Sequence, residues 1–464
     1  NNKTIENILK DPRSDILTSL YAQQARFNSE YPRCKNFARP FSSTHQNDFP
    51  TVLCYAYAET RTPNLFLIVI LKDMRILEIS TLFPRWPGDG RGPIILQIAQ
   101  ALQAQGNQVT VISQHGPGSQ VSEILHDVNV YRPRYAWPDR LESLQDTGGG
   151  LPAAWEKRPW TRLLFPMLLA AQTVAAMKLA PDHDIVHAHF TIPAMAATLS
   201  RPFHRNPVVA TVRGSDIYRI PNYPGGKLFN RIALSGCDKI TVMSKDLIKA
   251  SVALGMPETK FEYIPPPINI ERFTMGPWEN REPLLVYIAS LIPRKGPNFL
   301  IDAFAEVHRQ HPEYRLVMVG SGPMEMELKA QAEALGISQS TQFIPRLTQV
   351  DVAILLKKAM LFILPSLEEA LGMVAVEALA CGTPVVASRV GGIPEAVPEN
   401  AGKLVPPGDA DALAGAICEL LDDLLMLREL GMNARHWSET AFCSHQENAT
   451  RLLRIFEALV GRPQ

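Results

Sequence analysis

The sequence predicts an α/β protein made of two Rossmann-like domains that face a central cleft. From residue 74 onward, short apolar segments typical of buried strands alternate with helical segments. This alternation occurs in two successive series, and a proline-rich stretch separates them. In parallel sheets of this kind, ligands bind beyond the carboxyl ends of the strands. We therefore expect the loops at those ends to carry the chemistry.

Composition narrows the class further. The chain has 464 residues, of which 46% are hydrophobic, and equal numbers of basic and acidic residues. That balance excludes a disordered chain and argues against a nucleic-acid partner, which favours a basic surplus. Six cysteines without a CxxC pair indicate neither a disulfide scaffold nor a zinc site, and they fit a cytoplasmic protein. No uninterrupted apolar run reaches the roughly 18–20 residues of a membrane span, so we expect none, and the first 63 residues do not resemble a secretory signal.

The domain boundaries follow from changes in sequence texture. Residues 1–73 mix Pro, Asn, Ser and aromatic residues with little period, which predicts an atypical extension, with a disordered and an ordered segment as the two alternatives. Removing this segment and measuring activity distinguishes the two. The other expected parts are an N-terminal Rossmann-like domain over 74–264, a proline-rich linker over 265–283, a C-terminal Rossmann-like domain over 284–433, and a C-terminal helix over 434–464.

The first series begins with an alternating strand, a glycine-containing loop and an apolar-periodic helix, which is how a doubly wound domain starts. The expected strands share a short apolar core bounded by polar residues or prolines. They lie at 74–80, 109–113, 184–190, 207–214 and 239–244 in the first series, and at 284–290, 315–322, 341–345, 360–366 and 383–388 in the second.

The strongest chemical signal is a pair of glutamates near the end of the second series. Glu369 is expected in the loop after a strand, and Glu377 eight positions later in a helix that opens with Gly372, Met373 and Val374. Residues eight apart on a helix return to nearly one face, so both carboxylates can address one ligand. The free N–H groups and the positive end of the dipole at the start of that helix suit a phosphate. A site that accepts hydrogen bonds from sugar hydroxyls beside a bound diphosphate indicates a nucleotide-sugar ligand. The alternative is that both glutamates are solvated side chains of the helix and its preceding loop.

Four segments occur here in an order and spacing that resemble a known family: ASLIPRKGPNFLIDAF, LVMVGSGP, LPSLEEALGMVAVEALACGTPVV and GGIPEAV. They resemble the family 4 (group 1) retaining glycosyltransferases of the two-domain GT-B fold. The resemblance covers about residues 74–463 and is most specific over 284–408. It implies retaining transfer of a hexose from a UDP- or GDP-linked sugar to a hydroxyl acceptor, with a C-terminal helix that crosses back to the N-terminal domain.

The resemblance also implies roles for single residues of the C-terminal domain. Glu377 would bind the ribose hydroxyls and Glu369 the hydroxyls of the donor sugar, while Arg294 and Lys295 would hold the diphosphate. Physical reasoning agrees, since fixed cations stabilise a departing nucleoside diphosphate most when its charge is greatest; a solvated basic loop is the alternative. Backbone close to the donor is expected at Gly320 and Gly322, at Gly372, Met373 and Val374, and at Gly90 in the glycine-containing loop PGDGRG, where an ordinary flexible loop is equally compatible.

The N-terminal domain carries weaker signals. His187 and His189 lie two apart on a strand and so share a face. The resemblance favours an acceptor-facing role for them, with simple packing as the alternative. Asp182 and Asp184 lie nearby, but a lone strand lacks a further ligand, so no metal site is expected.

The strand that follows ends in VRGSDI. Asp216 matches the family and would bind a sugar hydroxyl or cap the next element. Arg213 departs from the histidine that the family usually has there, which leaves it free to hold a phosphate or an acidic acceptor. Ala370, where the family usually has glycine, narrows the space beside the donor sugar.

No nucleophile is paired with a base, so the resemblance implies a same-face displacement in which the leaving phosphate helps to deprotonate the acceptor, without a metal or other cofactor. Its setting would be the synthesis of a cell-surface polysaccharide, lipopolysaccharide or glycolipid. Two other classes stay open: a nucleotide-sugar epimerase of the same fold, and a catalytically silent donor-binding protein. Incubation with uridine and guanosine diphosphate sugars separates the three.

Residues 155–235 combine a basic surplus with aromatic and aliphatic residues. Ten Lys or Arg face four Asp or Glu there, and the apolar residues Trp155, Trp160, Leu163, Leu164 and Phe165 are interleaved with Lys157, Arg158 and Arg162. This combination suits an anionic membrane surface and a lipid-linked acceptor at the inner face of the membrane. A solvated face over a buried helix is the alternative.

Overall fold

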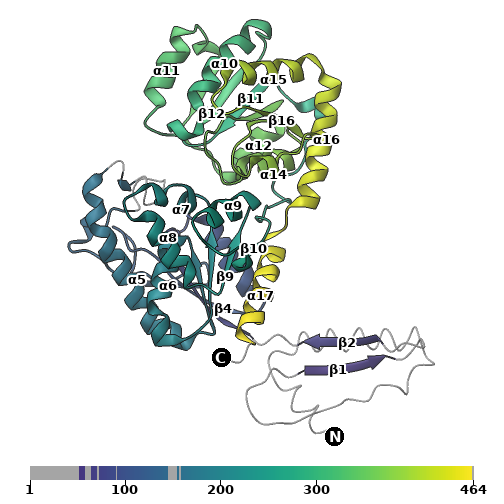
Figure 1. Ribbon diagram of the computed structural model, residues 1–464. Helices are drawn as coiled ribbons and strands as arrows, with labels where there is room; N and C mark the ends of the chain where they lie inside the picture. Colours follow the sequence, from purple (N-terminus) through teal and green to yellow (C-terminus); the bar gives the residue numbers. More distant parts are fainter. Residues whose placement is uncertain are drawn as a thin grey trace. The chain divides into compact units, whose positions relative to one another are not determined.

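The computed structural model describes residues 73–89, 91–144, 154–155 and 158–461, together with the backbone of two further strands. The chain divides into two compact units, residues 1–73 and 74–464. In the first unit, strand β1 (Val52–Tyr57) pairs antiparallel with β2 (Asn64–Val69) (Figure 1). The rest of the predicted extension before Asp73, and the predicted donor contact Gly90, lie outside the described residues.

The N-terminal lobe of the second unit is built on an eight-stranded sheet in the order β10-β9-β8-β7-β3-β4-β6-β5. All neighbouring strands are parallel except β5 and β6. The five strands predicted for this half are present, whereas β5, β6 and β10 were not predicted. The strands are β3 (Arg75–Ser80), β4 (Gln108–Ile112), β5 (Ser122–Leu125), β6 (Val128–Tyr131), β7 (Ile185–His189), β8 (Val208–Val212), β9 (Lys239–Val242) and β10 (Phe261–Tyr263).

Helices cover both faces of this sheet, because alternate residues of each buried strand are apolar on both sides. Helices α5, α6, α8 and α9 contribute to the core on one face, and α3 and the C-terminal helix contribute to the core on the other. The helices of this lobe are α3 (Pro93–Gln103), α5 (Phe165–Leu179), α6 (Thr191–His204), α7 (Ser215–Tyr218), α8 (Gly226–Ser235) and α9 (Lys245–Ala253).

Helix α5 corrects one expectation from the sequence. With the turns at both ends, Pro159–Asp182 forms a helical stretch of 24 residues whose apolar window has a mean hydropathy of 1.6, long and apolar enough to cross a membrane by length and composition. The length of this apolar helical segment was underestimated from the sequence, because Pro166 was counted as an interruption. It lies in the first turn of α5, where proline is tolerated. Leu168 and Gln172 are fully buried, and Gln172 donates a hydrogen bond to Ser80 O at the sheet. This helix therefore packs as part of the core of the lobe.

The C-terminal lobe contains a six-stranded, wholly parallel sheet in the order β13-β12-β11-β14-β15-β16 (Figure 1). The five predicted strands are present, and β16 is additional. The strands are β11 (Leu284–Ile288), β12 (Arg315–Val319), β13 (Thr341–Ile344), β14 (Leu361–Leu364), β15 (Val385–Ser388) and β16 (Gly402–Val405). The helices are α10 (Pro297–Gln310), α11 (Glu325–Ala334), α12 (Gln349–Lys358), α13 (Met373–Ala380), α14 (Ile393–Ala396), α15 (Ala410–Asp422), α16 (Leu424–Ala441) and α17 (His445–Val460).

The segment predicted as one helix over 434–464 is the end of α16 followed by α17. The break occurs because Phe442 is extended and the Ser444 hydroxyl caps the new helix by accepting a hydrogen bond from Glu447 N. At the break, Cys443 O accepts a hydrogen bond from Ile268 N, and Cys443 Sγ lies 3.2 Å from Pro265 O. The two connections between the lobes, the linker and the α16–α17 junction, are therefore hydrogen-bonded to each other.

Helix α17 packs on the N-terminal lobe, although it follows the whole C-terminal lobe in the chain. Its apolar face places Ala449, Leu452, Leu453 and Phe456 in the core shared with α3 and the sheet. We expect Phe456→Ala to lower the free energy of unfolding by about 3–5 kcal/mol, because the ring is fully buried and its loss leaves a cavity. Urea unfolding measures this change, and Val460→Ala, at an exposed position of the same helix, is the matched control.

Candidate active site

Two loops of the C-terminal lobe bring predicted residues together at the carboxyl edge of the sheet. Arg294 and Lys295 follow β11, and Glu368 and Glu369 follow β14. Lys295 Nζ forms an ion pair with Glu369 Oε2, and Arg294 Nη1 lies 3.6 Å from Glu368 Oε1. The two backbones are joined as well, because Leu367 N donates a hydrogen bond to Arg294 O at 2.8 Å. The loops thus hold two cations and two carboxylates in one partly buried cluster.

Gly296 lets the loop of Arg294 and Lys295 lie close to the loop after β14. Its φ is +60°, and a Cβ atom there would lie 2.0 Å from Pro365 O. We expect Gly296→Ala to lower the free energy of unfolding by more than the about 1–2 kcal/mol that the left-handed conformation alone costs. Gly336→Ala is the matched control, since Gly336 has a φ of +74° and nothing within 4 Å of the added Cβ. Equal losses in the two variants, measured by urea unfolding, would contradict the close approach.

Helix α13 begins at Met373, directly after Gly372, as predicted. Among the described residues no side chain caps it, so the N–H groups of Met373 and Val374 are available to an anion. Glu377 lies one turn further along the helix and is half-buried. Burial raises the pKa of Glu377 to about 7, with Arg272 opposing the shift. This carboxyl group therefore titrates near neutral pH.

Gly320 and Gly322 lie in the loop after β12, because this strand ends at Val319 and not at residue 322 as predicted, and the structure gives the two glycines a packing reason. A Cβ atom at Gly320 would lie 1.9 Å from Ala289 O, and one at Gly322 would lie 2.1 Å from Leu291 O. The absence of side chains lets this loop pack directly on the backbone after β11. Both loops therefore lie at the same edge of the sheet as Lys295.

The N-terminal lobe has a buried polar cluster at the carboxyl ends of β7 and β8. His187 and His189 are fully buried, with ring centroids 4.3 Å apart, and a carboxylate from β3, Glu78, lies 3.2 Å from His187 Nδ1. Arg213 Nη2 lies 3.4 Å from His189 Nδ1. Asp216 lies inside α7, where its Oδ1 accepts hydrogen bonds from Arg213 N and Gly214 N in the loop before the helix, and no side chain in the described part of the chain caps α7.

Burial shifts the pKa values of this cluster. It lowers the pKa of His189 to about 4 and that of Arg213 to about 10, so the imidazole is neutral and the guanidinium charged at pH 7. It raises the pKa of Asp216 to about 6, against the hydrogen bonds from the backbone. Burial would also raise the pKa of Glu78, but its electrostatic interactions with His189 and His187, together with hydrogen bonding, outweigh burial and hold the pKa at about 2.

The ligand atoms of Glu78, His187 and His189 lie within 4.8 Å of one another, close enough for a metal ion. The third ligand that the sequence analysis found lacking is therefore present. Both ring nitrogens of His187 are already engaged, with Glu78 and with Thr211 Oγ1 at 2.7 Å. The guanidinium of Arg213 beside His189 adds a fixed positive charge, which opposes a dication. The arrangement fits a hydrogen-bonded network better than a metal centre.

Asp182 and Asp184, the aspartates near the histidine pair in the sequence, lie at the other edge of the sheet. Asp184 precedes β7 and pairs with Arg75 at the start of β3, 2.9 Å apart. This edge contains the amino ends of the strands, whereas Arg213 and Lys295 follow the carboxyl ends of strands in their respective sheets.

The two lobes touch beside the site. A Cβ atom on Gly214 would lie 2.4 Å from Ala370 Cβ, so the loop of Arg213 packs against the residue after Glu369. Close by, the Glu395 carboxylate of α14 accepts hydrogen bonds from Lys245 N and Asp246 N, at 2.7 and 2.8 Å, at the start of α9. A carboxylate suits the positive end of a helix. These contacts place the loop of Arg213 beside the loop of Glu369.

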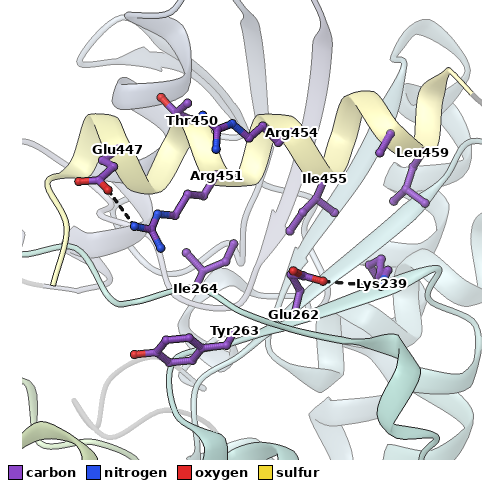
Figure 2. A pocket seen from close by; sticks show the side chains of 11 residues that line it. Lys239, Glu262, Tyr263, Ile264, Glu447, Thr450, Arg451, Arg454, Ile455 and Leu459 are labelled. Atoms are coloured by element: carbon purple, nitrogen blue, oxygen red, sulfur yellow. Dashed lines mark hydrogen bonds and ion pairs between the residues drawn. The ribbon is translucent and has the colours of Figure 1, made fainter. Parts of the chain in front are cut away.

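A separate groove of about 520 Å³ runs between α17 and the edge strand β10 (Figure 2). Its charged residues are largely paired with one another: Lys239 with Glu262, and Arg451 with Glu447. Tyr263 and Ile264 line its floor. None of the predicted site residues lines this groove, so it is not part of the candidate active site.

Comparison with known proteins defines the class. The family model "Glycosyl transferases group 1" matches residues 271–437, and the model "Glycosyltransferase Family 4" matches residues 90–272. The N-acetyl-alpha-D-glucosaminyl L-malate synthase of Bacillus anthracis is 30% identical over 58% of this chain and 73% of its own length. The chain therefore belongs to the group 1, family 4 glycosyltransferases, and its two parallel-sheet lobes form the GT-B fold.

Two further proteins illustrate the spread of its relatives. The GDP-mannose-dependent alpha-(1-6)-phosphatidylinositol monomannoside mannosyltransferase of Mycolicibacterium smegmatis is 28% identical over 73% of this chain and 91% of its own length. Among solved structures, Anabaena HepE in complex with UDP superimposes with a TM-score of 0.64, at 19% identity, over 83% of this chain and all of that chain. The protein is thus a glycosyltransferase, and its relatives act with different sugars.

Several residues that the fold brings to the site were not predicted from the sequence. Glu78 carried a signal, since it is a charged residue inside the apolar strand segment RILEIS. Glu395 and Tyr218 carried none, because only the fold places the Glu395 carboxylate on α9 and the Tyr218 hydroxyl 2.5 Å from Asp246 Oδ2. The prediction of a surface position was wrong for Trp155 and Leu164, which are buried in a small core cluster. Trp160 and Leu163, predicted for the same surface, are exposed.

Proposed function

We propose that this protein is a retaining glycosyltransferase that moves a hexose-type sugar from a UDP- or GDP-linked donor to a hydroxyl acceptor. The observation that supports this most is the cluster of Lys295, Glu369 and the start of α13 at the ligand edge of the C-terminal sheet. A cation and free N–H groups suit a diphosphate, and a carboxylate suits sugar hydroxyls. The relatives support either nucleotide, since one is named for GDP-mannose and another binds UDP.

The proposed roles follow the chemistry of each side chain. Arg294 and Lys295 hold the diphosphate together with the N–H groups that open α13. Glu377 accepts hydrogen bonds from the ribose hydroxyls and Glu369 from those of the donor sugar. Arg213, half-buried at the end of β8, provides a further cation beside the reacting centre.

The proposed acceptor side is the N-terminal lobe. His187 and His189 support it from inside β7, since both rings are fully buried. Asp216 accepts a hydrogen bond from a sugar hydroxyl through Oδ2, which has no hydrogen-bond partner in the described ranges. Gly320 and Gly322 let the nucleotide approach the backbone of the C-terminal lobe. Gly90 is proposed as a donor contact on the sequence pattern alone.

The proposed mechanism needs no covalent glycosyl-enzyme. The acceptor hydroxyl attacks the anomeric carbon on the face from which the diphosphate leaves, and the departing phosphate oxygen takes the hydroxyl proton. Lys295 and Arg294 stabilise the negative charge that grows on the leaving diphosphate. We expect turnover to be independent of divalent metal, and dialysis against a chelator measures this.

A panel of UDP- and GDP-linked sugars tests the function. We expect slow release of nucleoside diphosphate from one donor without an acceptor, and a product that keeps the anomeric configuration, read by NMR. An epimerised sugar would indicate the epimerase alternative. Binding of a donor without turnover, measured by calorimetry, would indicate a silent donor-binding protein.

We further propose a lipid-linked acceptor and peripheral attachment at the cytoplasmic face of a membrane, in the synthesis of a cell-surface glycan. Trp160, Leu163 and Met167 have exposed side chains on and before α5, and Arg158 and Arg162 lie among them. Exposed apolar residues with basic neighbours suit an anionic bilayer. Co-sedimentation with phosphatidylglycerol vesicles, and its loss in Leu163→Glu, tests this surface; Met326→Glu, at an exposed position of the other lobe, is the control.

A further inference from the structure

A chain of buried polar side chains crosses four neighbouring strands of the N-terminal sheet. Thr241 on β9 and Thr211 on β8 have their hydroxyls 2.6 Å apart, and Thr211 lies 2.7 Å from His187 Nε2 on β7. His187 Nδ1 then lies 3.2 Å from Glu78 Oε1 on β3. Phe456 of α17 packs edge-on against His187 and covers the chain with an apolar ring. These residues face the core rather than solvent, so their order is a property of the fold.

Glu78 is the charged end of this chain and is fully buried. Its Oε1 lies 3.5 Å from His189 Nε2, a close approach without a hydrogen bond, since neither His189 Nε2 nor Glu78 Oε2 has a hydrogen-bond partner among the described residues. Burying an isolated carboxylate in an apolar sheet costs several kcal/mol unless an opposite charge compensates it. His189 is neutral at pH 7, because burial lowers its pKa to about 4, and the negative charge of Glu78 opposes the lowering of the Arg213 pKa by burial.

Arg213 is the cation that the network reaches. Its Nη2 lies 3.4 Å from His189 Nδ1, on the side of the ring opposite the nitrogen that approaches Glu78. The order is therefore carboxylate, imidazole, guanidinium. Arg213 Nε has no hydrogen-bond partner in the described part of the chain, so the guanidinium depends on few direct contacts for its orientation. Its backbone neighbours Gly214 and Asp216 fix the loop but not the side chain.

Arg213 carries a full charge that burial disfavours, and Glu78 carries the opposite charge at the other end of the His189 ring. A fixed opposite charge nearby favours one orientation of the long Arg213 side chain. Holding the side chain in this way costs less entropy than holding it through ordered water molecules.

We propose that Glu78 is a positioning residue, which acts through His189 to hold the Arg213 guanidinium at the ligand edge of the sheet. Its role in the reaction rests on the proposed function, because Arg213 touches the substrates only if the protein binds them there. The orientation of Arg213 itself can be measured without any substrate.

The first measurement is the rate at which phenylglyoxal modifies Arg213, followed by peptide mass spectrometry, in wild type and in Glu78→Gln. The reagent attacks deprotonated, mobile guanidine, so we expect the rate to rise about threefold or more when the counter-charge is lost. Asp238→Asn is the control, because Asp238 pairs with Arg201 at the amino ends of the same strands, 2.8 Å apart. An unchanged rate at Arg213 in Glu78→Gln overturns the proposal.

The second measurement is turnover with the donor found in the panel. We expect kcat of Glu78→Gln to fall about tenfold or more with little change in the KM for the donor, since misplaced reacting groups cost rate steeply. In the Arg213→Lys variant, adding Glu78→Gln should lower kcat little further. If Glu78 were merely structural, the fall in kcat caused by Glu78→Gln would be as large in this variant as in the wild type. If Arg213 is modified faster in Glu78→Gln but kcat does not fall, Glu78 has no role in the reaction. If the protein turns over no donor at all, the proposed function is contradicted, but the modification experiment still tests the orientation of Arg213.

A third measurement covers the case in which Glu78→Gln folds poorly. If Glu78 and Arg213 compensate each other, Arg213→Leu leaves a lone buried carboxylate, and adding Glu78→Gln should recover part of the lost Tm. If the losses of Tm in Arg213→Leu and Glu78→Gln simply add in the double variant, without recovery, the stability measurement alone overturns the proposal.

Discussion

Lys295→Ala is expected to lower kcat by about 10²- to 10³-fold, the usual cost of removing one preorganised group that stabilises a transition-state charge. Lys295 is held beside Glu369 between the loops that follow β11 and β14, and both side chains are largely buried. The ammonium group is thus fixed before the donor arrives. As the diphosphate departs, its growing negative charge meets a cation that needs no reorganisation. Glu369→Ala should cause a loss of similar size, because it removes both the sugar contact and the partner of Lys295.

The control for this experiment is Lys358→Ala, in the same lobe. Lys358 Nζ lies 3.0 Å from Glu282 Oε1, but both side chains are largely exposed, and such pairs contribute little. Circular dichroism should show that all three variants stay folded. Near-native turnover in Lys295→Ala would contradict the role proposed for this cation. Lys295→Arg should recover only part of the rate, since a planar guanidinium does not replace a point charge.

Much of the C-terminal site could be predicted because its residues lie close together in the sequence. Glu369, Gly372 and Glu377 fall within nine positions, and a strand, loop and helix fix their relative placement. Lys295 could be added because parallel strands bring their carboxyl ends to the same edge. Local sequence and the alternation of strands and helices therefore suffice for this half of the site.

The N-terminal half could be predicted only in part, because its geometry comes from pairing across the sheet. Glu78 reaches His187 through the register of β3 with β7, which pairs residues 109 positions apart. The contact of Glu395 with α9 depends on how the lobes meet, and no local pattern encodes it. The break between α16 and α17 was missed although the Ser444 cap that starts α17 is local; the hydrogen bond from Ile268 N to Cys443 O, between residues 175 positions apart, is the part of this junction that no local pattern encodes.

Glu377 is expected to make donor binding depend on pH. Because burial raises its pKa to about 7, the carboxylate form should increase about tenfold between pH 6 and pH 8. Only that form accepts both ribose hydroxyls, so the affinity for a nucleotide sugar should rise over the same interval. A nucleotide sugar is the right probe for calorimetry, since its phosphates are both esterified and do not titrate there. Glu377→Gln should lower the affinity about 10- to 100-fold at pH 8 and flatten the pH profile.

The same pKa shift makes an opposite prediction for stability. A carboxyl group whose pKa is raised in the folded state keeps its proton longer than in the unfolded chain, so ionisation above about pH 5 destabilises the fold. The free energy of unfolding of the wild type should therefore fall, relative to Glu377→Gln, as the pH rises from 5 towards 8. Glu333→Gln, on the exposed face of α11, is the control and should follow the wild type. Affinity that rises with pH while stability falls is the signature of a carboxylate kept buried for a ligand, and parallel curves for wild type and Glu377→Gln would remove that role.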